Sequence, residues 1–437
     1  MPEHTPHPSP TPEHARLAAW FRDHAVTLDG LDPDAPLDDL EPLRALVGDA
    51  RVVAVGEGAH FVREFTHARR RVLRFLAERC GFTVLAFEFG FAEAFPLDRW
   101  LRGEDDGPGD AGLEAIGGTA YSGANGDLLR WLRRHNRASG HPLRFVGVDL
   151  PTAAGELRPV LEPLADYLRT VDPGAVARVD AALAVADRVT GSSGAVAAPR
   201  WDRLAAAEQD ALTASLARLL LRLRGLEPLY VDRGGRAAYD VALRHLEAAT
   251  HTDYMFGAMR DLFAGRGEPG DTSVREVYMA ESLRWHLDRA EPGARFVLAA
   301  HNNHAQKTPV RFDDTLTGLP MGHHLHRALG DDYRAIALTH TAGHVPEMYP
   351  DPDHPAGFAV AEARLDEPAP GSVEAALTEA GLGGALTLTD LRPGPPEGLD
   401  GIRTQSGVLR TPVAEAFDAV LSTPTVTTSY TDAVHQG

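Results

Sequence analysis

Acidic and imidazole side chains recur at the ends of four apolar segments of the sequence, which span residues 52–55, 83–89, 144–150 and 295–300. The side chains at or just beyond these ends are Glu57, His60, Glu88, Asp149, His301 and His304. A carboxylate can fix the tautomer of an imidazole, and an imidazole held in this way can take a proton from water. A second imidazole or an arginine can stabilise the negative charge that follows. These residue types therefore indicate acid–base hydrolysis, provided that the fold brings them together.

The segments must be strands of one sheet for these side chains to meet. Four apolar residues in a row, as in 52–55, are typical of a strand buried on both faces of a parallel sheet. Helical periodicity occurs between the segments, and the alternation predicts an α/β fold with a largely parallel central sheet flanked by helices. Parallel strands end at one edge, where open α/β sheets bind ligands. We therefore expect one shared polar cleft at that edge.

The helix expected at 61–79 carries an arginine on its apolar face. Arg69 completes a row formed, at spacings of three and four, by Val62, Phe65, Val72 and Leu76. A buried guanidinium is costly unless anions meet it, and Glu57 and a second strand-end acid are available. In the alternative interpretation, only the stem of Arg69 is buried and its head reaches solvent. The remaining arginines that lie off the apolar row are expected in solvent: Arg63, Arg70, Arg71 and Arg74.

Composition divides the chain into a core and an insertion. The expected divisions are a disordered tail at 1–14, a single domain at 15–425 and a frayed tail at 426–437, the domain having an α/β core at 45–151 and 273–420 and a helical insertion at 152–272. The insertion is expected to form one wall of the cleft, since it is rich in alanine, leucine and arginine. Its helices are expected at 173–189, 202–224 and 237–249. Other helices are expected at 15–25, 128–139 and 273–289, and other strands at 333–339, 357–365 and 385–391.

The net charge, the cysteine count and the length of the apolar runs limit the partners that the protein can have. A net charge of −19 argues against binding to nucleic acid or to an anionic membrane surface. Cys80 is the single cysteine, which excludes an internal disulfide framework and a cysteine-based zinc site. No apolar run approaches the roughly 18 residues of a membrane span, and residues 1–13 do not resemble a signal peptide. We expect a cytoplasmic protein; nothing in the sequence indicates its oligomeric state.

Three kinds of chemistry remain open for the cleft. The first is hydrolysis by water that His60 activates, and the second is a metal hydrolase whose ligands are Glu57, His60, His301 and His304. The third is nucleotide binding, because glycines follow the first strand, but Phe61 stands where a third glycine is needed and Glu57 would repel a pyrophosphate. A serine hydrolase is disfavoured because no Gly-x-Ser-x-Gly motif is present. The histidines expected at the surface are His67, His323, His324 and His326.

Five motifs together resemble the erythromycin esterase family, and most closely the type II macrolide esterases. They are Gly56-Glu-Gly-Ala-His60, Phe87-Glu-Phe-Gly-Phe-Ala-Glu93, Gly147-Val-Asp-Leu-Pro151, Ala300-His-Asn-Asn-His-Ala-Gln-Lys-Thr-Pro309 and Pro320-Met-Gly322. The likeness extends over residues 17–420. It implies hydrolysis of the lactone ester of an erythromycin-like macrolide antibiotic, with that small molecule and water as the reactants.

The resemblance also implies roles for individual residues. The family's general base corresponds to His60, its essential acids to Glu57 and Glu88, and its functional arginine to Arg69. Two further cleft histidines correspond to His301 and His304, which with Arg69 would stabilise charge and the leaving hydroxyl. Asp149 occupies a motif position and is expected to help bind substrate or to make a supporting hydrogen bond. The resemblance implies catalysis without a metal or another cofactor, which favours the first chemistry over the second. A metal-dependent esterase for another ester, or a non-catalytic macrolide-binding protein, remains the alternative.

Overall fold

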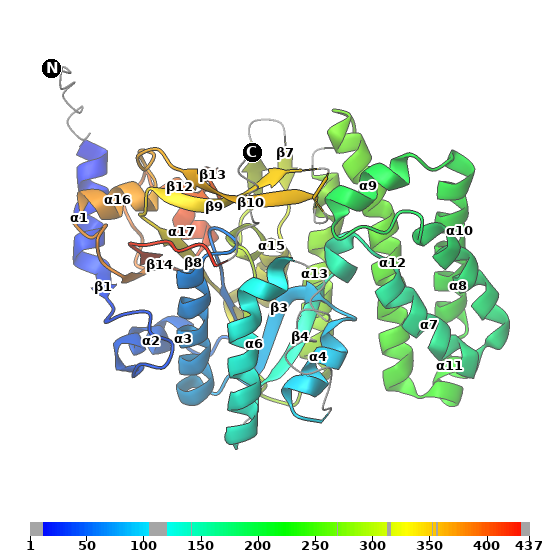
Figure 1. Ribbon diagram of the computed structural model, residues 1–437. Coiled ribbons are helices and arrows are strands. Elements are labelled where there is room, and N and C mark those ends of the chain that lie inside the picture. The colour runs from blue at the N-terminus through cyan, green and yellow to red at the C-terminus, as the bar shows by residue number, and fades with distance from the viewer. Residues whose placement is uncertain are drawn as a thin grey trace.

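The fold is built around an eight-stranded sheet that carries helices on both faces (Figure 1). The computed structural model describes residues 12–104, 120–140, 142–268, 270–312, 316–351, 353–354 and 357–429 of the 437. In spatial order the strands are β1 (Ala25–Thr27), β11 (Thr387–Asp390), β14 (Ala419–Thr423), β8 (Tyr333–His340), β2 (Val52–Val55), β5 (Phe296–Ala299), β3 (Val84–Gly90) and β4 (Arg144–Asp149). The six strands from β14 to β4 are parallel, and β1 and β11 pair antiparallel at one side. The predicted α/β class with a largely parallel sheet is confirmed.

The two faces of the sheet bury different helices because successive side chains of a strand point to opposite faces. Val53 and Val55 pack into one core with α3 (Arg63–Cys80), while Val52 and Ala54 pack into the other core with α13 (Val274–Arg289). The first core also includes residues of α2 (Pro42–Val47), α4 (Ala94–Leu101) and α6 (Ala120–Ala138). The second also includes residues of α1 (Pro12–His24), α15 (Met321–Leu329), α16 (Val373–Glu379) and α17 (Val413–Ala416). Burial on both faces explains the continuous apolar run of β2.

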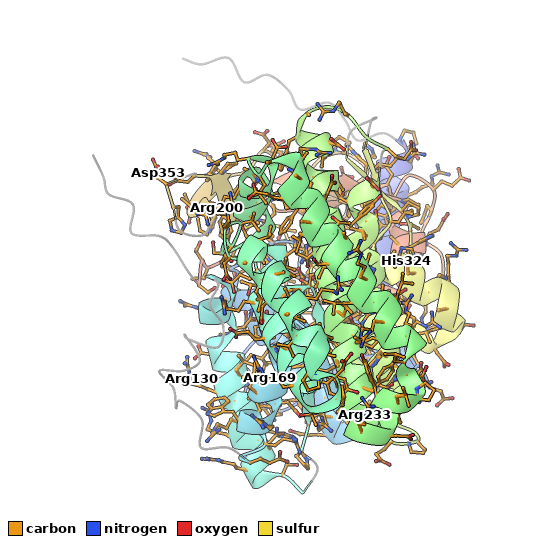
Figure 2. The ribbon with its side chains drawn as sticks, turned by 90° about the vertical axis from the view of Figure 1, so that its right-hand side faces the viewer. Arg130, Arg169, Arg200, Arg233, His324 and Asp353 are labelled. Atoms are coloured by element: carbon orange, nitrogen blue, oxygen red, sulfur yellow. The ribbon has the colours of Figure 1, made fainter. Side chains whose placement is uncertain are left out.

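The insertion forms a separate helical lobe at one side of the sheet, and Figure 2 views it from outside. Its helices are α7 (Arg158–Val171), α8 (Pro173–Ala186), α9 (Gly194–Asp202), α10 (Ala206–Gly225), α11 (Glu227–Gly234) and α12 (Arg236–Phe263). Most of its buried apolar residues form a third core of their own. The helix α12 extends well beyond the predicted 237–249, since Phe256 and Ala258 continue its buried side. Arg244 of this helix donates to the carbonyl of Tyr278 on α13 at 2.7 Å, which joins the lobe to the sheet core.

Two small sheets lie beside the carboxyl ends of the central strands (Figure 1). One pairs β9 (His344–Pro350) with β10 (Phe358–Arg364), and the other has the order β12 (Gly401–Thr404), β13 (Gly407–Arg410), β6 (Val310–Phe312) and β7 (Leu316–Gly318). The strand predicted at 357–365 therefore exists, but it pairs outside the central sheet. The short elements η1 (Asp38–Leu40), η2 (Pro151–Ala154), η3 (Asp271–Ser273), α14 (Asn302–Ala305) and η4 (Gly330–Asp332) complete the described fold. None of its helices is long and apolar enough to cross a membrane.

Two expectations about local order were wrong. Residues 12–14 of the expected tail belong to α1, which begins at Pro12, and residues 1–11 lie outside the described part. The frayed tail expected from 426 is ordered up to residue 429, where the amide of Ser429 donates to the carbonyl of Phe61 at 2.7 Å. Residues 430–437 lie outside the described part. The ordered C-terminal segment thus contacts the loop that carries His60.

Arg71 was also expected in solvent, yet it is 2% exposed. Its guanidinium pairs with Asp39 at 2.7 Å and donates to the carbonyl of Pro36 at 2.7 Å. The loop before α2 covers this face of α3, so a side chain outside the apolar row is nevertheless enclosed. Arg70 and Arg74 are half-buried, and Arg63 is exposed as expected.

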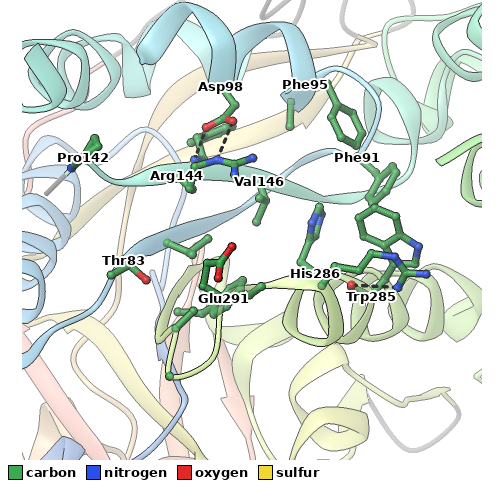
Figure 3. A pocket seen from close by; sticks show the side chains of 18 of the residues that line it. Thr83, Phe91, Phe95, Asp98, Pro142, Arg144, Val146, Trp285, His286 and Glu291 are labelled. Atoms are coloured by element: carbon green, nitrogen blue, oxygen red, sulfur yellow. Dashed lines mark hydrogen bonds and ion pairs between the residues drawn. The ribbon is translucent and has the colours of Figure 1, made fainter. Parts of the chain in front are cut away.

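The outer edge of the sheet, strand β4, is blocked against pairing with another chain. Asp98 of α4 accepts the amide of Phe145 at 2.8 Å and a bond from Arg144 at 2.9 Å. Burial lowers the pKa of His286 to about 3, so this ring is neutral, and its Nε2 lies 3.1 Å from the carbonyl of Gly147. These groups border a pocket of about 490 Å³ (Figure 3). Thr83, which directly precedes β3, also lines the pocket, so the pocket extends to the sheet edge opposite the predicted cleft.

Candidate active site

The predicted site residues converge because their strands are neighbours. The order β2, β5, β3, β4 places the segments carrying Glu57 and His60, His301 and His304, Glu88, and Asp149 side by side at one edge. Close backbone approach is needed where the first two loops meet. A Cβ on Gly56 would lie 1.9 Å from Oδ1 of Asn302, and one on Gly58 would lie 2.9 Å from the carbonyl of Leu338. The two glycines that punctuate the first motif are therefore required by packing between β2 and its neighbours.

His60, Glu57 and Arg69 form a continuous chain of contacts. Nδ1 of His60 lies 2.8 Å from Oε1 of Glu57, and the other oxygen of Glu57 pairs with Arg69 at 2.8 Å. Burial alone would raise the pKa of Glu57, but the charge of Arg69 and the contact with His60 hold it below its ordinary value. An ionised Glu57 can accept a hydrogen bond from Nδ1–H of His60, and in that tautomer the lone pair of the ring lies on Nε2. The geometry thus prepares Nε2 of His60 to accept a proton.

Arg69 is buried, as the helical row predicted, and the interpretation in which its head reaches solvent was wrong. It is 4% exposed, and Nε donates to the carbonyl of Val55 at 3.3 Å. One terminal nitrogen donates to the carbonyl of Ala300, and the other pairs with Glu57. The guanidinium therefore ties the ends of β2 and β5 to Glu57. Because its nitrogens are engaged in this way, the geometry favours a positioning role over direct contact with substrate.

His301 presents a neutral imidazole with one nitrogen free. Its backbone amide donates to Glu88 at 2.8 Å, and its Nδ1 accepts the amide of Asn303 at 3.2 Å. Burial lowers the pKa of His301 to about 3. With Nδ1 acting as an acceptor, the proton of the neutral ring lies on Nε2, which is buried without a hydrogen-bond partner among the described residues. Its ring centroid lies 4.8 Å from that of His60, so this donor stands beside the candidate base.

His304 lies between two carboxylates. Its Nε2 is 3.2 Å from Glu88, and its Nδ1 is 2.7 Å from Glu276. Burial would lower the pKa of His304, but the two carboxylates raise it from 6.5 to about 10. Burial would likewise raise the pKa of Glu88, yet His304 and Arg275 hold it well below its ordinary value. His304 is therefore a fixed cation at neutral pH, and both of its nitrogens are already engaged.

Asp149 lies behind this group rather than at its surface. It is 2% exposed, and its Oδ1 accepts from Nε of Arg275 at 2.9 Å and from the amide of Leu150 at 2.7 Å. The same guanidinium reaches Glu88 at 3.3 Å. Such burial gives Asp149 the supporting hydrogen bond that was one expectation and leaves it poorly placed to bind substrate.

Two residues of α13 were missed by the sequence analysis. Arg275 links Asp149 to Glu88, and Glu276 holds His304 while accepting the amide of Met321 at 2.8 Å. Neighbouring charges of opposite sign at the start of an amphipathic helix are usually solvated, so the pattern gave no signal. Both residues are half-buried, because α15 and the strand ends pack over the first turn of α13. The histidines expected at the surface are half-buried instead, namely His67, His323, His324 and His326.

Most of the side-chain atoms at the site that could bind a metal ion already contact other groups of the protein. Within the described part of the chain, no group of three or more histidine, cysteine, aspartate or glutamate side chains is arranged to hold a metal ion. Both nitrogens of His304 and Nδ1 of His60 and His301 contact protein groups. Among the ring nitrogens of these histidines, Nε2 of His301 is buried without a hydrogen-bond partner in the described residues, and the ring of His60 lies beside it.

Comparison with known proteins identifies the family of the chain. A profile of the erythromycin esterase family matches residues 77–426. An erythromycin esterase type II from Escherichia coli is 34% identical over 406 residues, which cover 93% of this chain and 96% of that protein. A type I erythromycin esterase from Escherichia coli is 35% identical over 387 residues, covering 88% and 93%.

Solved structures also include an erythromycin esterase that is similar to this chain. A mutant of the erythromycin esterase EreC in its open conformation superposes with a TM-score of 0.85 at 34% identity, over 92% of this chain and 98% of that one. A Bacillus cereus protein shares the fold, with a TM-score of 0.75 at 21% identity over 97% and 99%. The resemblance inferred from the five motifs is confirmed, and the chain belongs to the erythromycin esterase family.

Proposed function

We propose that the protein hydrolyses the lactone ester of erythromycin-like macrolides by direct attack of water and thereby inactivates the drug. The observation that carries the proposal is the pairing of an oriented base with a neutral donor. Nε2 of His60 is left basic by Glu57, and Nε2 of His301 carries a proton beside it. Family membership supplies the substrate class, because the relatives in Escherichia coli are named for erythromycin. A macrolide carries a cationic amino sugar near neutral pH, which suits a chain of net charge −19.

In the proposed reaction, His60 removes a proton from water as the water oxygen attacks the lactone carbonyl carbon. The carbonyl oxygen becomes an oxyanion, which Nε2–H of His301 stabilises by a hydrogen bond. The tetrahedral intermediate then collapses and the carbon–oxygen bond of the ester breaks. The proton held by His60 passes to the leaving alkoxide, so the products are a carboxylic acid and an alcohol in one opened ring. Glu57 stabilises the imidazolium between the two proton transfers.

The fixed charges have supporting roles in this proposal. His304 supplies a permanent positive charge near the oxyanion, and Glu88 holds both that charge and the backbone of His301. A pKa of about 10 makes His304 a poor proton donor at neutral pH, which favours an electrostatic role. Arg69 and Asp149 position Glu57 and Arg275, respectively. No step uses a metal, and activity that survives exhaustive chelation would support that part of the proposal.

Replacing Glu276 with glutamine is expected to lower kcat about tenfold to a hundredfold, because His304 loses a carboxylate that holds its charge and position. The pKa of His304 should fall from about 10, so the alkaline decline of activity should move to lower pH. In stability terms, a raised pKa contributes at pH below 6.5 and is lost as the pH rises through about 10. The measurement is a pH profile of kcat, with urea unfolding at several pH values.

Glu281→Gln provides the matched control, because Glu281 lies on the same helix but pairs with Arg244 at the lobe. Its pH profile should match the wild type. A Glu276→Gln profile that also matches the wild type would show that Glu276 has no influence on the charge used in catalysis.

Mass spectrometry of erythromycin incubated with the protein tests the proposed activity itself. Hydrolysis adds one water to the drug, whereas a non-catalytic binding protein leaves its mass unchanged. A panel of other macrolides and simpler esters in the same assay defines the substrate range. Unchanged erythromycin, combined with turnover of a different ester, would reject the macrolide assignment while leaving the esterase chemistry in place.

A further inference from the structure

The loop that carries His60 is held by a hairpin distant in sequence. The turn between β12 and β13 reaches this loop with Gln405, whose backbone amide donates to the carbonyl of Gly58 at 2.6 Å. The side-chain Oε1 of Gln405 accepts the backbone amide of His60 at 2.7 Å. Gln405 therefore contacts the loop that carries His60 twice, once through its main chain and once through its side chain.

The orientation of the Gln405 amide is determined by its neighbours. The backbone N–H of His60 can only donate, so it must meet the oxygen of the amide. On the other side, the nitrogen of the amide lies 3.4 Å from the carbonyl of Pro346 and 3.4 Å from Oε1 of Glu347, both of which can only accept when Glu347 is ionised. Reversing the amide would place like groups together on both sides. Gln405 is thus held between β9 and the His60 loop.

The turn itself is held in an unusual backbone conformation. Gln405 has a φ of 47°, in the left-handed region that non-glycine residues rarely adopt. The carboxylate of Glu347 stabilises the turn by accepting the amide of Ser406 at 2.8 Å and that of Met348 at 2.7 Å. A glycine would adopt this backbone with less strain, so backbone geometry alone does not explain a glutamine here. The side-chain bond to His60 does explain it.

We infer that Gln405 is a positioning residue for His60, and that Glu347 orients Gln405 for this purpose. The inference rests on the proposed function, in which Nε2 of His60 accepts a proton from water. Holding the backbone of His60 keeps its ring against Glu57 and beside His301, where a small displacement would separate the base from the attacking water.

The test compares three variants with the wild type by steady-state kinetics on erythromycin. Gln405→Ala and Gln405→Gly remove the acceptor, and each should lower kcat about tenfold to a hundredfold while KM stays within about twofold. Gln405→Gly should be at least as stable to heat as Gln405→Ala, since it relieves the left-handed backbone. Ser406→Ala is the control, because Ser406 is exposed and contacts Glu347 through its backbone amide, and it should match the wild type.

A charge exchange between the two partners provides the rescue experiment. Gln405→Glu keeps an oxygen for the amide of His60 but places a second carboxylate against Glu347, so kcat should fall. Adding Glu347→Gln to it removes the repulsion between the two carboxylates, but an oxygen still faces the carbonyl of Pro346 and one backbone amide loses its acceptor. The double variant should therefore recover part of the kcat lost in Gln405→Glu. A double variant as impaired as Gln405→Glu alone would contradict the role of Glu347 as the partner that orients this residue.

Wild-type kcat in both Gln405→Ala and Gln405→Gly would overturn the inference and leave the proposed function untouched. If instead the wild type does not hydrolyse erythromycin, the proposed function fails, and a crystal structure of Gln405→Ala decides the positioning separately. The 2.8 Å contact between His60 and Glu57 should then be lengthened or His60 should occupy a second conformer. An unchanged contact would reject the inference.

Discussion

Replacing His60 with alanine is expected to lower kcat for erythromycin hydrolysis by about a hundredfold to ten-thousandfold, the usual contribution of a general base. The ring is half-buried and contacts the interior through Glu57, so its removal leaves Glu57 and Arg69 paired and the fold intact. Binding of the drug should change little, because the lost interaction acts on water. Steady-state kinetics compares kcat and KM of His60→Ala with those of the wild type, and thermal unfolding compares their stability.

His67→Ala is a suitable control, since His67 lies in the first part of α3 and the charges that act on it come from outside the site, namely those of Glu64, Arg63, Arg70 and Asp127. It should retain the wild-type kcat. A His60→Ala variant that keeps kcat within about threefold of the wild type would remove His60 as the base, because general-base contributions are far larger.

Replacing Arg69 with methionine is expected to have the second-largest effect, on both stability and activity. Removing one partner of a buried ion pair typically costs about 3–5 kcal/mol of unfolding free energy, because the remaining carboxylate of Glu57 stays buried without its cation. The pKa of Glu57 should rise, so the acidic limb of the pH–kcat profile should move to higher pH. kcat at neutral pH should fall about a hundredfold, since the Nδ1 proton of His60 loses its ionised acceptor.

The pH dependence of this stability loss has a defined sign. The folded-state pKa of Glu57 lies below its ordinary 4.5, so its contribution to stability is present above pH 4.5 and is lost as the pH falls through the folded value. The difference in unfolding free energy between wild type and Arg69→Met should therefore be large at neutral pH and shrink in acid. Urea unfolding across this range measures it.

Arg71→Met is the matched control for Arg69→Met. Arg71 lies on the same helix and is equally buried, but it pairs with Asp39 on the far side from the site. This variant should lose stability and keep the kcat of its folded fraction. Equal losses of kcat in the two variants would mean that Arg69 acts only through the stability of α3, and not through Glu57.

The sequence predicted those features of the site that follow from local pattern. Continuous apolar runs identify β2, β3, β4 and β5, and parallel pairing then places Glu57, Glu88 and His301 at one edge. The helical row identified Arg69 because its apolar neighbours share the face that packs on the sheet. In each case the residue is placed by the burial of one face of a single helix or strand. The spacing of apolar residues along the sequence shows directly which face that is.

Features that depend on which other segment packs over a helix or strand could not be predicted from local sequence patterns. Arg71 is buried by the loop before α2, and Arg275 and Glu276 are half-buried beneath neighbouring segments, although all three have the pattern of surface charges. Gln405 lies in a short polar turn, and its contact with His60 joins residues 345 positions apart. The strand β14 at 419–423 enters between β11 and β8 from the far end of the chain. No local periodicity encodes such long-range pairing.

The central claim is that water, and not a carboxylate of the protein, attacks the lactone carbonyl. Single-turnover hydrolysis of erythromycin, with the enzyme in excess and in water enriched in the heavy oxygen isotope, tests it most directly. Direct attack predicts that the ring-opened acid carries one heavy oxygen after the first turnover and that peptides containing Glu57 or Glu88 carry none. An unlabelled first-turnover product, with the heavy oxygen found in either glutamate, would contradict direct attack of water on the lactone carbonyl.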